Sequence, residues 1–157
     1  MFIIQGLITG IIATIIFDIF QYSLSFAYGI DKPKWNLIGR YFLGYKKGIY
    51  IRHSISEDEQ EGEELIWGYL IHYIIGMVYG AFYVLLNKLM FDYPSILLAY
   101  FIGFSSVLGA WCYLMPFAFN LGFFASKSEK RLELMSQNLI SHFIFGTGLF
   151  IGLYIIY

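Results

Sequence analysis

The segment Glu63–Gly80 reads EELIWGYLIHYIIGMVYG and decides the fold. It begins with two carboxylates, becomes apolar around the single histidine His72, and closes on Gly76 and Gly80. Two glycines four residues apart are typical of membrane helices that pack closely against a neighbour. If this helix spans a bilayer, a histidine at that depth must face protein or water and not lipid. The segment therefore predicts a membrane-spanning helix with a polar group inside the protein.

The composition of the whole chain indicates the same class. Of 157 residues, 59% are apolar and only 13% are charged, whereas soluble domains carry about 25% charged residues. We therefore predict an all-α polytopic membrane protein that forms a single integral membrane domain over residues 1–157. The single cysteine, Cys112, excludes an internal disulfide and a multi-thiolate metal site. The first apolar run is expected to be a retained helix and not a cleaved signal peptide.

Four apolar stretches, at about 2–29, 65–86, 95–119 and 136–157, are long enough to cross the hydrocarbon core. They predict a bundle of four transmembrane helices. Pairs of small residues four apart predict the faces through which these helices pack. The pairs are Gly6/Gly10, Gly76/Gly80, Ser105/Gly109 and Gly148/Gly152. Pro116 is expected to kink the third helix near its end.

The only long loop, residues 30–64, interleaves aromatic and basic residues and then carries the acidic run SEDEQEGEE. Its first half suits the anionic headgroup layer of a bilayer, and its acidic half is expected to be a solvated turn. This loop holds six Lys and Arg residues and the loop after the third span holds three, whereas the connection between spans two and three has only Lys88. The asymmetry predicts that both basic loops are cytoplasmic and that both termini lie on the non-cytoplasmic side.

This topology brings one polar side chain from each span into the cytoplasmic half of the bundle: Asp18, His72, Asn120 and His142. The helical rise places Asp18 about 16 Å, His72 about 10 Å and His142 about 9 Å below the ends of their helices. Two imidazoles and a carboxylate could bind a divalent metal such as zinc or iron, or relay protons. Ligation of a haem iron by the two histidines is disfavoured. The alternative is a purely structural role, in which these residues make interhelical hydrogen bonds and Asp18 is neutral or capped by Thr14 and a tyrosine.

A second group of candidates lies in the loop and at the start of the second span: Arg40, His53, Glu63 and Glu64. These residues are expected to form a cytoplasmic entrance or to contact headgroups. The planar fork of Arg40 could hold a phosphate, although an interfacial anchor is the simpler interpretation. No Gly-rich phosphate loop, HExxH, G-x-S-x-G or CxxC motif is present in the sequence. Lipid is a simpler partner for the basic loop than nucleic acid.

The leading hypothesis is a membrane protein that binds or translocates a small cation or a proton through Asp18, His72 and His142. A second hypothesis is a non-catalytic accessory or scaffold subunit whose glycine faces dock a larger membrane partner. A third is a membrane-embedded hydrolase or transferase acting on lipid, with a histidine as base and Arg40 holding phosphate. A functional homodimer is compatible with the small size of the chain.

Motifs along nearly the whole chain carry a resemblance. They are Asp18, Gly39-Arg40-Tyr41, Arg52-His53-Ser54-Ile55, Trp67-Gly68, His72-Tyr73, Gly76, Pro116, Gly122, Ala125-Ser126, Arg131, His142 and Phe145-Gly146-x-Gly148-Leu149. In order and spacing they resemble a family of small four-span bacterial inner-membrane proteins of unknown function. The resemblance implies the four-helix architecture and a bacterial inner-membrane location, and it implies no activity. Tyr41 stands where the family pattern has tryptophan, and the acidic run before Trp67 is longer than expected.

Overall fold

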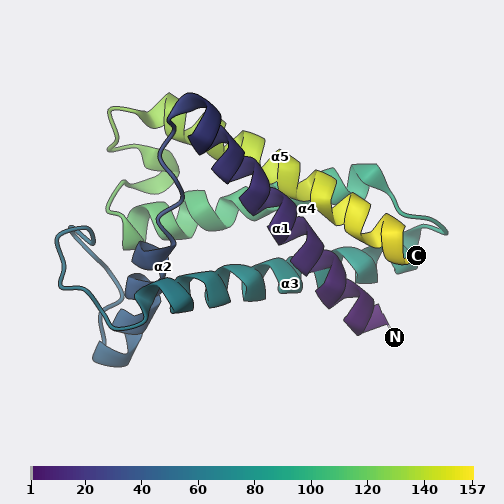
Figure 1. The fold of residues 1–157 in the computed structure, drawn as a ribbon, viewed down its shortest axis with the longest axis horizontal. Helices are drawn as coiled ribbons and strands as arrows, with labels where there is room; N and C mark the ends of the chain where they lie inside the picture. The colour runs from purple at the N-terminus through teal and green to yellow at the C-terminus, as the bar shows by residue number, and fades with distance from the viewer. Residues whose placement is uncertain (1) are drawn as a thin grey trace. The chain divides into compact units, whose positions relative to one another are not determined.

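The computed structural model describes residues 2–157, and over this range the chain is helical with no strand. The prediction of an all-α fold is confirmed. Five α-helices follow one another along the chain (Figure 1): α1 (Phe2–Tyr28), α2 (Trp35–Leu43), α3 (Glu64–Met90), α4 (Ile96–Gly109) and α5 (Arg131–Ile156). A π-helix, η2 (Ala110–Ala118), continues α4, and two short 3-10 helices are η1 (Gly44–Lys47) and η3 (Phe123–Ala125).

Within the described residues, four helices are long and apolar enough to cross a membrane: α1, α3, α4 together with η2, and α5. Apolar runs of this length form helices in lipid because only a helix satisfies every backbone polar group within its own segment. Large apolar side chains such as Phe26 and Leu97 point outward from these helices. This is the helix content of an integral membrane protein. The helices correspond to the predicted spans, although α3 continues to Met90 and α5 already begins at Arg131.

The chain divides into two compact units, and the division falls within α3, α4 and α5. The first unit comprises Met1–Lys32, Tyr73–Ser106 and Leu139–Tyr157. The second unit comprises Pro33–His72 and Val107–Asn138.

In the first unit, α1 packs antiparallel against both α3 and α5 through small residues. A Cβ atom added to Gly10 would lie 2.3 Å from the carbonyl oxygen of Gly76, and one added to Gly148 would lie 2.7 Å from Cα of Ala13. Backbones this close leave no room for a side chain and gain dispersion contacts instead. The predicted use of Gly6/Gly10, Gly76/Gly80 and Gly148/Gly152 in packing is confirmed.

The predicted pair Ser105/Gly109 is wrong, because a Cβ atom on Gly109 would meet nothing within 4 Å. Helix α4 instead approaches α5 through Gly103, whose added Cβ atom would lie 2.7 Å from Cα of Gly146. The spacing of small residues does not show which face of a helix meets its neighbour. The sequence therefore could not indicate that Gly103, and not Gly109 on another face, makes the contact.

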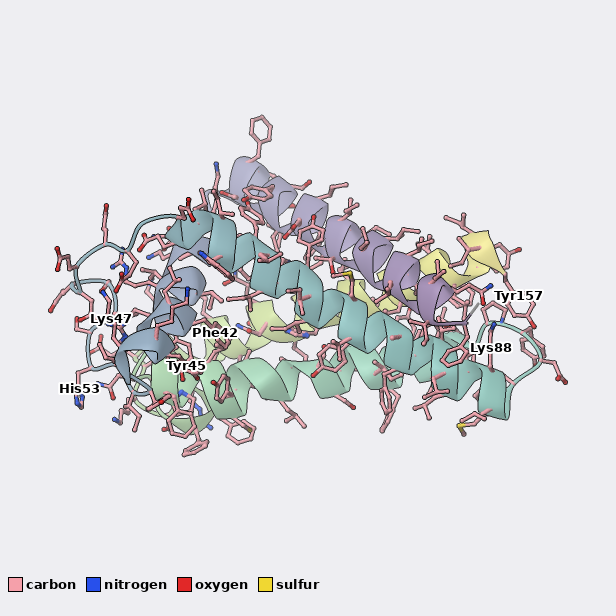
Figure 2. All side chains as sticks on the ribbon, turned by 90° about the horizontal axis from the view of Figure 1, so that it is seen from below. Phe42, Tyr45, Lys47, His53, Lys88 and Tyr157 are labelled. Atoms are coloured by element: carbon pink, nitrogen blue, oxygen red, sulfur yellow. The ribbon has the colours of Figure 1, made fainter. Side chains whose placement is uncertain are left out.

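The N-terminus, the C-terminus and the α3–α4 connection meet at one end of the first unit. Gln5 Nε2 donates to the carbonyl oxygen of Ile156 at 3.3 Å. The Tyr157 hydroxyl contacts the carbonyl oxygen of Asp92, and the Lys88 ammonium contacts Gln5, so Lys88 and Tyr157 lie close together in Figure 2. Such a meeting is expected when helices alternate in direction across a bilayer.

In the second unit, α2 packs against the first turns of α3. A Cβ atom on Gly39 would lie 1.7 Å from the carbonyl oxygen of Glu64, and one on Gly68 would lie 1.9 Å from that of Trp35. A core of Leu37, Tyr41, Ile55 and Ala118 forms beneath this contact. Residues 30–64 are therefore more structured than the sequence suggested, since α2, η1 and a turn in which the N–H of Glu57 donates to the carbonyl oxygen of Ser54 lie within the expected loop.

The end of the third span changes from α-helical to π-helical hydrogen bonding over η2, which begins at Ala110 and contains Pro116. Because proline has no N–H to donate, the regular α-helical ladder cannot continue through it. The N–H of Phe119 donates to the carbonyl oxygen of Leu114 at 3.1 Å, which closes a π-type ring. Asn120 and Gly122 then adopt positive φ angles of 55° and 72°, which turn the chain. The expected kink is realised as a π-helix followed by a sharp turn.

Candidate functional site

Asp18 is buried within the first unit and reaches an open groove. It lies on the face of α1 that meets α3, and the hydroxyl of Tyr73 donates to its Oδ2 at 3.2 Å. The groove has a volume of about 680 Å³. Its lining is Ile15, Asp18, Ile19, Tyr22, Ser23, Phe26, Ala27 and Tyr73. A carboxylate at this position combines a buried charge with an accessible space beside it.

Of the two side chains expected to cap Asp18, a tyrosine and Thr14, the tyrosine donates to the carboxylate and the hydroxyl of Thr14 does not. The tyrosine is Tyr73 of α3. The hydroxyl of Thr14 instead donates to the carbonyl oxygen of Gly10 at 2.8 Å, within its own helix. Threonine commonly makes this bond to the preceding turn, and it removes Thr14 as a donor to the carboxylate.

His142 lies in the same unit, against a different side of α1. Its Nδ1 is 2.6 Å from Oγ of Ser106, and that hydroxyl also donates to the carbonyl oxygen of Gly103 at 2.6 Å. Since a hydroxyl has one hydrogen to give, these contacts together favour the tautomer with a proton on Nδ1. The ring packs edge-to-face with Phe17, with 5.9 Å between centroids. Gln21 donates to the neighbouring Ser141 at 2.9 Å.

His72 and Asn120 belong to the second unit. The imidazole of His72 stacks on Trp35, with ring centroids 3.9 Å apart and planes 22° apart. Asn120 follows the end of η2 and does not stand in a helix. Its Nδ2 donates to the carbonyl oxygen of His53 at 3.2 Å, and its Oδ1 accepts from Lys127 at 2.9 Å. The amide of Asn120 thus fixes the turn that follows the π-helix.

The tentative metal site of Asp18, His72 and His142 finds no support in the geometry. Within the part of the chain that the structure describes, no group of three His, Cys, Asp or Glu side chains lies together in a way that could hold a metal ion. Structural and catalytic zinc sites need three or four such ligands. What the structure places at Asp18 is a carboxylate beside a tyrosine hydroxyl.

Arg40 is buried in the second unit and bonded on both sides of its guanidinium. Its Nε and Nη2 donate to the two carboxylate oxygens of Glu64 at 2.7 and 2.9 Å. Its Nη1 donates to the carbonyl oxygens of Ile55 and Asp58 at 2.8 and 2.9 Å. The hydrogen bond to Glu64 raises the pKa of Arg40 above its usual range. These bonds make Arg40 a structural clamp that fastens residues 55–58 to α3, a role that the sequence did not predict.

A second ion pair extends this clamp. Arg52 Nη1 donates to Asp58 Oδ2 at 2.6 Å, and its Nη2 donates to the carbonyl oxygen of Arg40 at 3.2 Å. His53 is exposed next to this pair and lines a smaller groove of about 480 Å³ in the second unit. Glu63 is exposed and has a positive φ of 61°, at the point where the chain enters α3. Of the four entrance candidates, Arg40 and Glu64 are thus bonded to each other, His53 is exposed, and Glu63 lies where the chain turns into α3.

The comparisons with known proteins bear on the chain as a whole. A family model described as "Protein of unknown function (DUF2938)" matches residues 7–156. The chain belongs to this family. The DUF2938 match covers nearly the entire sequence, in agreement with the extent of the resemblance described above. No curated protein and no solved structure matches the chain.

Membership of the DUF2938 family supplies no activity, so the site must be argued from its own residues. Sequence reasoning found Asp18 but missed Tyr22 and Tyr73, which line the groove beside it. A signal existed for Tyr22, which follows Asp18 by four residues on the same helical stripe. No such signal existed for Tyr73, because the sequence does not show which face of α3 contacts α1. In the structure the glycine contacts fix that face. Arg52 and Asp58 were likewise missed as a pair.

Proposed function

We propose that this protein binds a small cation or a proton at Asp18, in the groove between α1 and Tyr73. The observation that carries the proposal is a buried carboxylate, in a helix able to span a membrane, beside an open groove of about 680 Å³. A carboxylate inside a membrane is costly, and such residues usually mark an ion or proton pathway. Binding of a cation or a proton would remove the unfavourable charge.

The proposal includes an orientation in a bacterial inner membrane. The two basic loops would face the cytoplasm, and both termini would lie outside, in accord with the distribution of Lys and Arg. The exposed Lys46 and Lys47 would then reach the anionic headgroups of the inner leaflet. Lys46 Nζ lies 5.1 Å from the ring centre of Trp67, and Phe42 and Tyr45 pack together nearby with centroids 5.5 Å apart (Figure 2). Aromatic rings and lysines in combination suit that layer.

Infrared difference spectroscopy on purified, reconstituted protein tests the role of Asp18. Acidification, or addition of sodium or potassium chloride, should change a carboxyl band in the wild type. That change should be lost in Asp18→Asn and kept in Asp92→Asn, a matched removal of an exposed carboxylate from the α3–α4 connection. An identical difference spectrum in Asp18→Asn and wild type would refute the proposal. Uptake into proteoliposomes loaded with a pH-sensitive dye would then separate binding from translocation.

A further inference from the structure

We infer that the ligand of the Asp18 groove is a lipophilic organic ammonium ion that enters from the bilayer. This inference rests on the proposed function and names its ligand class. It is argued from the size of the groove, from the charges and rings that line it, and from the surface onto which it opens.

The size of the groove indicates an organic ligand. Its volume is about 680 Å³. Sites for organic molecules measure about 300–1,000 Å³, whereas a monatomic cation is held by ligand atoms within about 2–3 Å of its centre. A bare ion would leave most of this space to be filled by something else.

The charge of the lining indicates a cation of low charge density. Asp18 is the one carboxylate in the lining, and the groups that a hard divalent cation requires are not gathered in the described residues. An alkylammonium ion needs only one counter-charge, and it gains further from the faces of aromatic rings. Two tyrosines, Tyr22 and Tyr73, supply such rings in the groove.

A contact already present shows that Tyr22 is placed to receive a cation. The ammonium of Lys32 lies 5.7 Å from the centre of the Tyr22 ring, within the range of a cation–π interaction. Lys32 follows α1 in the chain, so this contact marks the end of the groove nearest the loop. Asp18 lies about 6 Å further down the helix, by the rise of 1.5 Å per residue over four residues.

The walls of the groove indicate the route of entry. Ile15, Ile19 and Phe26 form apolar walls on α1, and all three are exposed, with Phe26 95% exposed. In a helix that spans a bilayer, exposed apolar side chains face lipid. A ligand that passes between them to reach a carboxylate must be apolar over most of its surface and cationic at one end. The source of the ammonium group is either a membrane lipid or a dissolved amphipathic amine.

Calorimetric titration of the protein in nanodiscs of pure phosphatidylglycerol tests the inference, because this lipid carries no ammonium group. The probes are benzyltrimethylammonium and its uncharged isostere neopentylbenzene. The variants are Asp18→Asn and the matched control Asp92→Asn. Circular dichroism and size-exclusion profiles confirm that each variant is folded.

The inference predicts that benzyltrimethylammonium binds to the wild type and to Asp92→Asn, and that neopentylbenzene does not. Asp18→Asn should weaken binding about tenfold or more, the loss expected for one charge-assisted contact. Equal binding of both probes, or unchanged affinity in Asp18→Asn, overturns the inference.

The two proposals fail in different ways. An infrared response at Asp18 to protons or sodium, without binding of benzyltrimethylammonium, overturns the ligand class and leaves the proposed function standing. No response at Asp18 to any of these probes overturns both. If the probe binds, nanodiscs that also contain phosphatidylethanolamine identify the source of the ligand. A lower affinity for benzyltrimethylammonium in these nanodiscs means that the lipid amine competes for the groove, and it identifies a lipid as the source. An unchanged affinity identifies a dissolved amphipathic amine.

Discussion

The guanidinium of Arg40 holds Glu64 through two parallel hydrogen bonds and holds two backbone carbonyl groups with its other nitrogen. Arg40→Lys keeps the positive charge, but an ammonium group cannot reproduce a planar fork with acceptors on opposite sides. Loss of one partner from a buried ion pair costs about 3–5 kcal/mol. We expect Arg40→Ala to fall near this range in chemical denaturation of the detergent-solubilised protein. Arg40→Lys, which keeps the charge but loses the fork, should cost less than Arg40→Ala and clearly more than the loss of a surface ion pair.

The control for Arg40 is an ion pair of the same loop that lies at the surface. Lys47 and Glu61 approach to 2.6 Å, but the Lys47 side chain is 58% exposed. An exposed pair of this kind contributes about 0–1 kcal/mol, so Lys47→Ala should scarcely change the stability. A small effect of Arg40→Lys, equal to that of Lys47→Ala, would show that the fork geometry of Arg40 is unimportant.

Tyr41 predicts a loss of stability at alkaline pH. It is 1% exposed, and its hydroxyl donates to the carbonyl oxygen of Tyr50 at 3.0 Å. Burial and the hydrogen bond with Tyr45 raise the pKa of Tyr41 above its usual value of 10.0. The unfolded chain therefore ionises first, so the contribution of Tyr41 is complete below pH 10 and falls as the pH rises above it. Tyr41→Phe should be less stable at neutral pH but should show a shallower decline of unfolding free energy between pH 9 and pH 11. Parallel profiles of unfolding free energy against pH for the wild type and Tyr41→Phe would show that Tyr41 does not cause the loss of stability at alkaline pH.

At the scale of the helix, the sequence predicted the four spans and three of the four small-residue packing pairs, and it missed α2 and the contact at Gly103. Long apolar runs predicted the four spans because lipid leaves the chain no alternative to helix formation. The small helix α2 was not foreseen, although its nine residues are amphipathic, because they are too few to stand out within a long connection rich in aromatic and basic residues. Pro116 predicted a kink, whereas the structure has a π-helix over Ala110–Ala118 that contains the proline, a form that the sequence pattern did not indicate.

The glycines offer a matched test of helix packing. A Cβ atom on Gly80 would lie 2.4 Å from the backbone of both Gly6 and Gly10, whereas one on Gly109 would meet nothing within 4 Å. Both glycines are inside helices, so the change in helix propensity is the same. Gly80→Ala should lower the stability by about 1–3 kcal/mol through overpacking, and Gly109→Ala should leave it unchanged or raise it. Thermal unfolding followed by circular dichroism measures both, and equal effects would exclude α1–α3 contact as the cause.

At the scale of the whole molecule, the candidate site was predicted only in part. Asp18 was found because a carboxylate in an apolar span is conspicuous. The predicted meeting of four polar residues assumed that each helix turns its polar group toward a common axis. In the structure Asp18 contacts α3, whereas His142 packs against Phe17. Phe17 immediately precedes Asp18 on α1. Neighbouring positions on a helix point about 100° apart, so depth alone cannot decide which groups meet.

The predicted orientation of the molecule depends on charges whose surroundings the structure describes. Nine Lys and Arg residues lie in the two basic loops and one, Lys88, lies in the opposite connection. Three of the nine, Arg40, Lys47 and Arg52, are ion-paired with carboxylates. Because acidic residues contribute little to the positive-inside rule, pairing should not cancel their effect. Leaving these three out of the count still gives six Lys and Arg residues against one, so the predicted cytoplasmic placement of both loops is the same with or without them.

Single cysteines in a Cys112→Ser background test this orientation. Asp92→Cys in the α3–α4 connection should react with a membrane-impermeant maleimide added to intact cells, because that connection is predicted to lie outside. Glu129→Cys, in the loop before α5, should react only after the cells are permeabilised. Both positions are exposed in the structure, so a difference in labelling reports sidedness and not burial. The reverse pattern would place the termini in the cytoplasm. The Lys32 end of the Asp18 groove would then face outward, and a ligand would meet Tyr22 from the opposite leaflet.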